Sequence, residues 1–254
     1  MKQRSLLRAL ACYYPKSLRD PGDFGGLMAG RIPNDVHKIL LCLDFDDEVW
    51  DFAAKERPDL ILTHHPFIFG TPAKVLKADP VKKTLYKKIT ANGFCVYSIH
   101  TNFDAGTPGM NDALVEELGL TNVRHLEGST MARGGDLAAP MEVHDFARYA
   151  KEKLGVSYGL LIAAGKATVS SVAIIGGGGW FENELAQKCG YDIYISGDMP
   201  HHGRREVVLR HYNYLDLPHE IEHVFMAQMK KTLLLIDPTL EVVTIDHEKL
   251  PEVI

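Results

Sequence analysis

The chain is poor in several features that would otherwise assign it to a class. It has four cysteines in 254 residues and no CxxC pair, and their mostly apolar surroundings are typical of buried free thiols in a reducing compartment. No apolar run approaches the roughly 20 residues that span a bilayer, and the apolar stretch at the start is too short for a signal peptide. We therefore expect a cytoplasmic protein that is used as written and has no membrane partner. The four cysteines are Cys12, Cys42, Cys95 and Cys189.

Basic residues are fewer than acidic ones, with 28 lysines and arginines against 33 aspartates and glutamates. The net charge is -5, so nucleic acid is an unlikely partner, and only a local basic cluster such as Arg204, Arg205 and Arg210 would attract it. What is present is a hydrophobic content of 46% and a charged content of 24%. These values suit one large globular unit, or two interlocked halves, with a substantial core.

Strand and helix patterns alternate along the first half of the chain. Short apolar runs predict strands, and amphipathic stretches with acidic starts or glycine ends predict the helices between them. The alternation predicts an α/β fold with a parallel sheet covered on both faces. The predicted strands are 38–44, 59–63 and 94–99, and the predicted helices are 46–57, 79–92 and 109–118.

The second half repeats this plan. Sliding the sequence against itself by 133 places, without a gap, lays the segment from Ser171 over the segment from Lys38, and apolar positions coincide along both strands. In this register Asp192 falls on Asp59. The sequence therefore predicts an internal duplication. The predicted parts are a first half at 1–120, a Gly-, Ala- and Pro-rich linker loop at 121–142 and a second half at 143–254.

Two adjacent histidines close the segment DLILTHHPFIFG, where a buried strand should end in a loop. Ligands collect at the carboxyl ends of parallel strands, and neutral imidazole is the commonest protein metal ligand. Because Pro66 favours an extended backbone at His65, strand alternation predicts that the side chains of His64 and His65 diverge, toward two ions or opposite sides of a cleft. The alternative is a polar strand end with solvated rings.

Further donors follow later strand ends. Asp104 lies in the segment SIHTNFDAG, and the segment DLPHEIEH carries His219 and Glu222. These last two residues are three positions apart, so a short helix would place both side chains on one face. Glu220 and His223 compete for the same role, although a solvated helix face also explains their spacing.

Three imidazoles and two carboxylates suit a pair of borderline divalent ions, such as zinc, iron, manganese or nickel. The absence of cysteine from the set argues against a closed structural zinc site. Two such ions activate water, so hydrolysis is the expected chemistry. The candidate ligands are His64, His65, Asp104, His219 and Glu222.

His100 lies four residues before Asp104. We expect it to act as a catalytic general acid or base, or to orient a ligand carboxylate, rather than to bind metal directly. Thr63 and Thr101 place hydroxyls beside the ligands, although strand threonines are usually structural.

The glycine run from Gly176 to Gly179 follows a predicted strand and precedes a predicted helix, as phosphate-binding turns do. It lacks the lysine of a P-loop and the spacing of a dinucleotide fingerprint, so a tight strand-to-helix turn explains it at least as well. Its role stays open at this stage, as does that of His201 and His202.

The motifs DLILTHHPFIFG, SIHTNFDAG, ISGDMPHH and DLPHEIEHVF, in this order, resemble the Nif-three-like family of dinuclear-metal hexameric proteins. Members of this family are often named as type 2 homologues of GTP cyclohydrolase I. The resemblance extends from PGDFGGLMAG to the final strand EVVTI, which is nearly the whole chain. The chain departs from the family at Pro218, where glycine is usual, and at Leu217 and Glu220.

The resemblance implies that His64, His65, Asp104, His219 and Glu222 bind two divalent ions per chain. It implies two similar, intertwined three-layer α/β/α halves and a toroidal homohexamer, a trimer of dimers, with its sites facing an internal cavity. The implied activity is that of a metal-dependent hydrolase of a small molecule, similar to GTP cyclohydrolase I type 2, whose substrate is unknown. The alternative is a non-enzymatic metal-binding or protein-interaction scaffold, in which protein ligands would saturate both ions.

Overall fold

The chain divides into two compact units in a computed structural model that describes residues 1–254. Unit 1 consists of Met1–Gly109 and Phe225–Glu248, and unit 2 consists of Met110–Val224 and Lys249–Ile254. The chain therefore enters each unit twice, so the two halves are intertwined in sequence rather than consecutive. The predicted end of the first half at residue 120 lies inside unit 2.

Unit 1 contains a five-stranded sheet with the order β1-β4-β3-β2-β11. The pairs β4–β3, β3–β2 and β2–β11 are parallel, whereas β1 is antiparallel to β4. The sheet is thus parallel as predicted except at one edge. The strands are β1 (Gly26–Gly30), β2 (Lys38–Cys42), β3 (Leu60–Thr63), β4 (Cys95–Ser98) and β11 (Glu241–Thr244).

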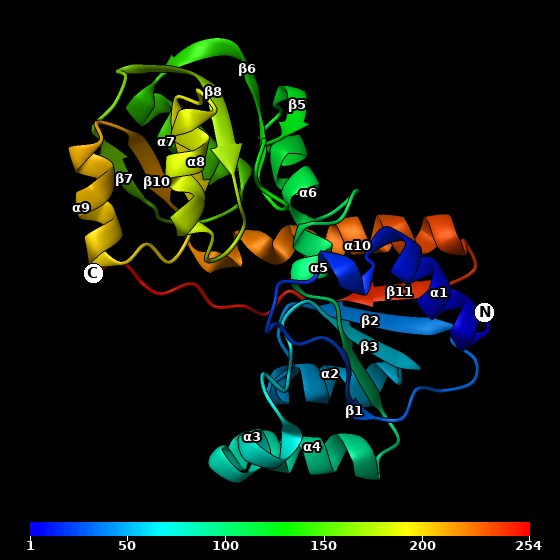
Figure 1. Cartoon of the computed structure of the whole chain (residues 1–254). Helices are drawn as coiled ribbons and strands as arrows, with labels where there is room; N and C mark the ends of the chain where they lie inside the picture. The colour runs from blue at the N-terminus through cyan, green and yellow to red at the C-terminus, as the bar shows by residue number, and fades with distance from the viewer. The chain divides into compact units, whose positions relative to one another are not determined.

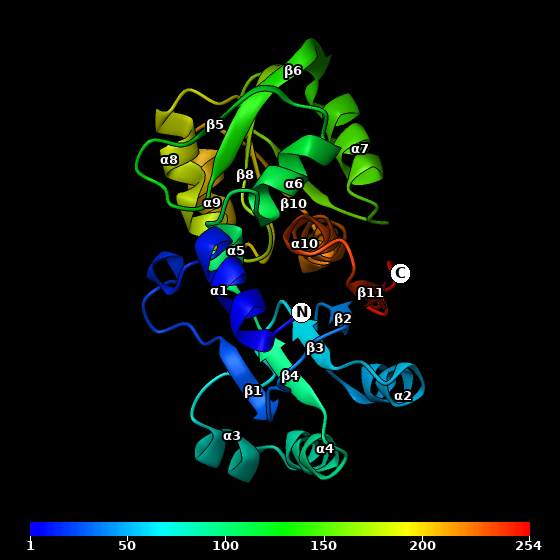
Figure 2. The same ribbon diagram turned by 90° about the vertical axis from the view of Figure 1, so that its right-hand side faces the viewer.

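Helices cover both faces of this sheet, with α2, α3 and α4 on one face and α1 and α10 on the other (Figure 1, Figure 2). The sequence predicts where α2 and α4 begin because their N-terminal caps are local. The side chains of Asp46 and Asp79 accept hydrogen bonds from the amides of Val49 and Lys82, each at 2.9 Å. The helices are α1 (Gln3–Tyr13), η1 (Lys16–Leu18), α2 (Asp47–Glu56), α3 (Pro72–Ala78), α4 (Pro80–Ala91), α5 (Thr101–Asp104) and α10 (Val224–Ile236).

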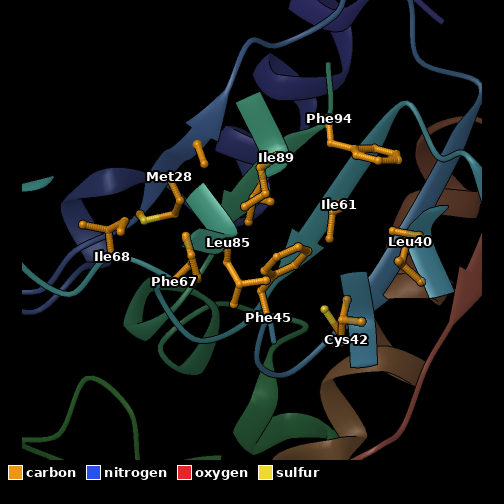
Figure 3. Packing of buried hydrophobic residues seen from close by; sticks show 14 residues of the cluster. Met28, Leu40, Cys42, Phe45, Ile61, Phe67, Ile68, Leu85, Ile89 and Phe94 are labelled. Carbon is orange, nitrogen blue, oxygen red and sulfur yellow. The ribbon is translucent and has the colours of Figure 1, made fainter. Parts of the chain in front are cut away.

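The core of unit 1 lies between the sheet and the α2–α4 layer (Figure 3). Alternate strand residues such as Leu40, Cys42 and Ile61 point to this side and meet Leu85 and Ile89 of α4. Burying side chains of this size stabilises the folded state by about 1.5 to 3 kcal/mol each. The packing holds the carboxyl ends of β3 and β4 in place, and these ends carry the candidate site.

Unit 2 contains a six-stranded sheet with the order β5-β6-β8-β9-β10-β7. The central strands β8, β9 and β10 are parallel, and the pairs β5–β6, β6–β8 and β10–β7 are antiparallel. Helices α6 and α7 cover one face, and α8 and α9 cover the other (Figure 1, Figure 2). None of the helices of the chain is long and apolar enough to cross a membrane. The elements are β5 (Thr121–His125), β6 (Arg133–Glu142), β7 (Leu160–Ala163), β8 (Thr168–Ile174), β9 (Ile193–Ser196), β10 (Asn213–Asp216), α6 (Met110–Glu117), α7 (Val143–Lys153), η2 (Trp180–Glu182), α8 (Asn183–Lys188), α9 (His201–Leu209) and η3 (His219–His223).

The segment predicted as a linker loop, 121–142, instead forms strands β5 and β6. Its glycines allow close packing within a sheet rather than a flexible connection. A Cβ added at Gly134 would lie 2.3 Å from the Tyr191 ring, and one at Gly135 would lie 2.7 Å from the Thr121 carbonyl oxygen. The linker prediction is wrong because composition cannot separate these two uses of glycine.

The two units repeat one arrangement, as the 133-residue register predicts. Strand β9 (Ile193–Ser196) lies 133 positions after β3 (Leu60–Thr63) at both ends. A carboxylate Oδ2 of Asp59 accepts the amides of residues 37 and 38 at 2.8 and 2.9 Å, and that of Asp192 accepts the amides of residues 170 and 171 at 2.8 and 3.2 Å. These matching hydrogen bonds support an internal duplication.

The Asp192→Ala substitution is expected to lower the free energy of unfolding by about 1 to 3 kcal/mol, because it leaves the partly buried amides of Ser170 and Ser171 without their acceptor. The ion pair with Lys166 adds little, since the lysine is exposed. Denaturant unfolding measures the loss. Asp51→Ala, at an exposed position of α2, is the control and should change stability by less than about 0.5 kcal/mol.

The cost of Asp192→Ala should also depend on pH. Burial works against the charged form of Asp192, but hydrogen bonds from Lys166 and from the amides of Ser170 and Ser171 outweigh it and lower the pKa below 3.8. A lowered pKa stabilises the folded state above the unfolded-state pKa and loses this effect as the pH falls. The difference between wild type and variant should therefore shrink below about pH 4, and a constant difference would contradict this assignment.

The cysteines divide into two classes. Cys42 and Cys95 are buried, as predicted, whereas Cys12 and Cys189 are exposed, which corrects the expectation that most of the four are buried. Burial raises the pKa of Cys95 to about 12 and that of Cys42 well above its usual range. We expect a disulfide reagent to modify only Cys12 and Cys189 in the native protein, because thiolates are the reactive form. Rapid reaction of all four thiols with the disulfide reagent before the protein unfolds would contradict this burial pattern.

Candidate metal centre

Three histidines converge at the carboxyl ends of β3 and β4 in unit 1. His64 and His65 directly follow β3, and their amides donate to the carbonyl oxygens of residues 42 and 43 at 3.2 and 3.0 Å. His100 follows β4, the adjacent parallel strand. One ligand atom from each of the three side chains lies within 4.8 Å of the others, a separation that a shared metal ion can bridge.

The rings of His64 and His65 do not diverge as strand alternation predicts. Their centroids are 4.9 Å apart. Strand β3 ends at Thr63, so both histidines lie in a bend, where the alternation of strand side chains no longer applies. The Thr63 hydroxyl stabilises this bend, because it donates to the carbonyl oxygen of His65 at 2.8 Å.

Each of the three rings is held through its Nδ1 atom by an oxygen that only accepts. A carbonyl or an ionised carboxylate requires the proton on Nδ1, so a neutral ring keeps its lone pair on Nε2. This arrangement orients metal-binding histidines and raises their basicity. The pairs are His64 Nδ1 with Ile99 O at 3.1 Å, His65 Nδ1 with Asp44 Oδ2 at 2.7 Å and His100 Nδ1 with Asp23 Oδ1 at 2.6 Å.

Asp104 joins these histidines from α5, the four-residue helix that follows His100. Its carboxylate is buried, and Oδ1 lies 3.5 Å from Nε2 of the fully buried His64. The His64 ring also packs against Phe225, with a centroid distance of 5.3 Å, so its orientation is fixed. Two atoms with lone pairs face each other here, which is a geometry that a cation stabilises.

Asp23 places a fixed negative charge behind His100. Burial disfavours the ionised carboxylate, but hydrogen bonds from His100 and Thr101 outweigh this effect and lower the Asp23 pKa to about 2. The Thr101 hydroxyl is engaged by Asp23 at 2.5 Å and by the Asp20 amide at 3.0 Å. The hydroxyls of Thr63 and Thr101 therefore have structural partners, as strand and loop threonines commonly do.

Unit 2 carries a second donor set on η3. Pro218 precedes this short 3₁₀ helix, and three residues per turn bring His219 and Glu222 onto one face, as the spacing predicts. Their Nε2 and Oε2 atoms are 3.2 Å apart. His219 Nδ1 lies 2.7 Å from Asp198 Oδ2, so this ring has the same anchoring as the three histidines of unit 1.

The competing residues of η3, Glu220 and His223, make other contacts in unit 2. Glu220 lines a surface pocket with Tyr158 and Arg204, and His219 lines the same pocket. His223 lies against Gly155, where an added Cβ would be 3.0 Å from its ring. The structure groups His219 with Glu222 rather than with either competitor.

The glycine run serves as a tight turn beside this donor pair. Gly177 has φ +61°, and a Cβ there would lie 2.3 Å from Glu222 Oε1 and 2.9 Å from His219 Nε2. Its carbonyl oxygen accepts from the Ser196 hydroxyl at 2.9 Å and from the Gly197 amide at 2.7 Å. Only glycine lets the backbone approach the two side chains this closely.

The donors of each unit suit divalent metal ions. Four imidazoles present an Nε2 lone pair while Nδ1 is anchored, and two buried carboxylates lie beside two of these rings. Nitrogen and oxygen donors of this kind suit zinc, iron, manganese or nickel. The anchoring oxygens of Asp23, Asp44 and Asp198 are the functional groups that the sequence did not identify. Asp44 lies two residues after the end of β2, so the strand-end rule that identified His64 also applies to it.

The chain belongs to the family Duf34/NIF3 (NGG1p interacting factor 3), which it matches over residues 1–251. It is 30% identical over 225 residues to a Clostridium perfringens protein named GTP cyclohydrolase 1 type 2 homolog, with 86% of each chain covered. A protein of the same name from Methanocaldococcus jannaschii is 27% identical over 256 residues, which are 97% of this chain and 100% of the relative.

Solved structures show the same fold. A Bacillus cereus protein related to NIF3 aligns with a TM-score of 0.90 at 20% identity and covers 100% of this chain and 99% of its own. Reduced HcgD from Methanocaldococcus jannaschii aligns with a TM-score of 0.80 at 25% identity, covering 97% and 98% of the two chains. The α/β fold with two sheet-containing halves and the family resemblance drawn from the motifs are both confirmed.

Proposed function

We propose that His64, His65, Asp104, His219 and Glu222 bind two divalent metal ions per chain. The support is the chemistry of the donors: each histidine of the set is anchored through Nδ1, and both carboxylates lie beside an Nε2 atom. Within each unit a carboxylate oxygen and an imidazole Nε2 face each other, and a divalent cation can bind both. The metal identity is among zinc, iron, manganese and nickel.

The activity we propose is metal-dependent hydrolysis of a small molecule. Divalent ions in such sites activate water and stabilise negative charge on the attacked centre. The side chains of His65 and His219 are 19% and 39% exposed, so the donors of each unit can be reached from solvent. Access of this kind favours catalysis over a closed structural site.

His100 has the role of moving a proton in this proposal. Asp23 holds its Nδ1 at 2.6 Å, which leaves Nε2 as the atom that accepts a proton from water or donates one to the leaving group. The relatives named GTP cyclohydrolase 1 type 2 homolog support a substrate with a hydrolysable nitrogen heterocycle, of which a purine nucleotide is one example.

A substrate screen tests the proposal. The full chain is loaded separately with zinc, iron, manganese and nickel, and each preparation is compared with a chelated sample on nucleotides, cyclic amides and phosphoesters. Turnover that requires metal and is lost in His65→Ala supports a hydrolase. Full metal occupancy without turnover of any substrate would favour the non-enzymatic scaffold.

We further propose that the chain acts in the cytoplasm as a homohexamer, a trimer of dimers. The family resemblance supports this assembly. Light scattering should give about six times the chain mass of 28.3 kDa, and a stable monomer would contradict the proposal.

A further inference from the structure

A cavity of unit 1 has a composition that suits an anion. It has a volume of about 220 Å³ and lies between α1, η1 and β4. Apolar side chains of α1 form one wall, and polar groups form the other. The polar lining comes from Lys16, Arg19, Tyr97, Ser98 and Asn102.

The charge of this lining is of one sign. Lys16 and Arg19 contribute two cations, and no aspartate or glutamate lines the cavity. The Arg19 Nε atom is buried and has no hydrogen-bond partner, while one terminal nitrogen, Nη1, makes only a long contact of 3.4 Å to the Gly25 carbonyl oxygen. A buried guanidinium donor without an acceptor is costly, so an acceptor that enters this cavity would gain binding energy.

Asn102 adds a group of the opposite kind. Its side chain is 4% exposed, and its Nδ2 donates to the Tyr14 carbonyl oxygen at 2.7 Å. This bond fixes the orientation of the amide, so Oδ1 is the acceptor, and it too is buried without a partner. A ligand of this cavity therefore needs hydrogen-bond acceptors that face Arg19 and one hydrogen-bond donor that faces Asn102.

The backbone at Gly25 lies against the guanidinium of Arg19. A Cβ at Gly25 would lie 2.6 Å from Arg19 Nη2 and 2.9 Å from Cζ. The guanidinium thus packs closely against the backbone of this glycine, where a larger side chain would displace it.

We propose that this cavity binds the phosphate group of a small phosphate monoester. A monohydrogen phosphate carries charged oxygens that accept from Arg19 and Lys16 and one P–OH group that donates to Asn102 Oδ1. The apolar wall of α1, with Leu7 and Leu10, accommodates a small carbon body. The site requires no metal ion.

Calorimetric titration of the metal-stripped, full-length chain with inorganic phosphate tests the proposal. Arg19→Met should weaken phosphate binding by at least about tenfold, since a charge-assisted hydrogen bond is lost. Arg8→Met, at an exposed position of α1, is the matched control and should bind phosphate as wild type does. Sulfate, which has no proton to donate at neutral pH, should bind more weakly than phosphate because Asn102 Oδ1 then lacks a donor.

Three results would overturn this proposal. The first is that the wild type binds no phosphate at millimolar concentration. The second is that Arg19→Met binds phosphate as tightly as wild type does. The third is that binding appears only in metal-loaded protein and disappears in His65→Ala. The last result would place the phosphate at the metal donors. If Arg19→Met does not fold, Lys16→Met and the comparison of phosphate with sulfate decide. Because the titration is done without metal, its failure leaves the hydrolase proposal intact.

Discussion

Removal of one imidazole from the pair after β3 is expected to reduce the metal content from about two ions per chain to one or fewer. The physical reason is that Nδ1 of each ring is already engaged, by Ile99 O for His64 and by Asp44 for His65, so Nε2 is the atom through which each ring would bind a metal ion. Truncation to alanine removes that atom from the donor set. Elemental analysis of His64→Ala and His65→Ala after reconstitution measures the result.

The two variants differ in their structural cost. His64 is fully buried against Phe103 and Phe225, so its truncation also leaves a cavity, with a loss of stability of about 2 to 4 kcal/mol. His65 is partly exposed, and its variant separates metal loss from unfolding. His37→Ala, at an exposed position, should keep two ions. Wild-type protein that holds less than one ion after reconstitution, or unchanged metal in both variants, refutes the dinuclear site.

The His100→Ala variant is expected to keep about two ions per chain while its hydrolytic rate falls by roughly 10²-fold or more, as is typical for loss of a general acid or base. The alternative is a ligand role, since a His100 ligand atom lies within 4.8 Å of those of His64 and His65. Metal content and turnover are measured on the same sample, with the substrate found in the screen. Loss of one ion would assign His100 to the metal.

Asp23→Asn replaces the carboxylate that anchors the ring of His100 with a neutral amide. The amide cannot hold a positive charge on the ring as the carboxylate does, so proton transfer should slow while metal content stays unchanged. Glu116→Gln, on an exposed turn of α6, is a control for loss of one carboxylate. A full rate in both His100→Ala and Asp23→Asn would remove His100 from the chemistry.

Local patterns explain why a large part of the fold could be predicted. Strands β2, β3 and β4 are short apolar runs, and α2 and α4 begin at aspartate caps three residues from the amides that they accept. The repeat register then transfers the β2–α2–β3 pattern to the second half without further assumptions. Each of these signals depends on residues near one another in the sequence.

The sequence-based predictions fail where a contact between residues far apart in the sequence determines the local structure. Composition assigns Gly134 and Gly135 to a linker, but they lie in β6, and glycine stands there because Tyr191 and the Thr121 carbonyl oxygen leave no room for a Cβ. In the same way, the glycine run at 176–179 shows its use only when Gly177 is seen beside Glu222. Composition reports which residue is present, and the reason for a glycine can lie many residues away.

The sequence by itself determined the candidate ligands and the elements that end beside them, because histidine and aspartate at strand ends are a local signal. Only the tertiary structure decided how the ligands are oriented. The anchor of His100 is Asp23, 77 positions away, and the anchor of His65 is Asp44, 21 positions away. Such pairs depend on the order of strands in the sheet, which long-range packing sets and which no periodicity of the chain encodes.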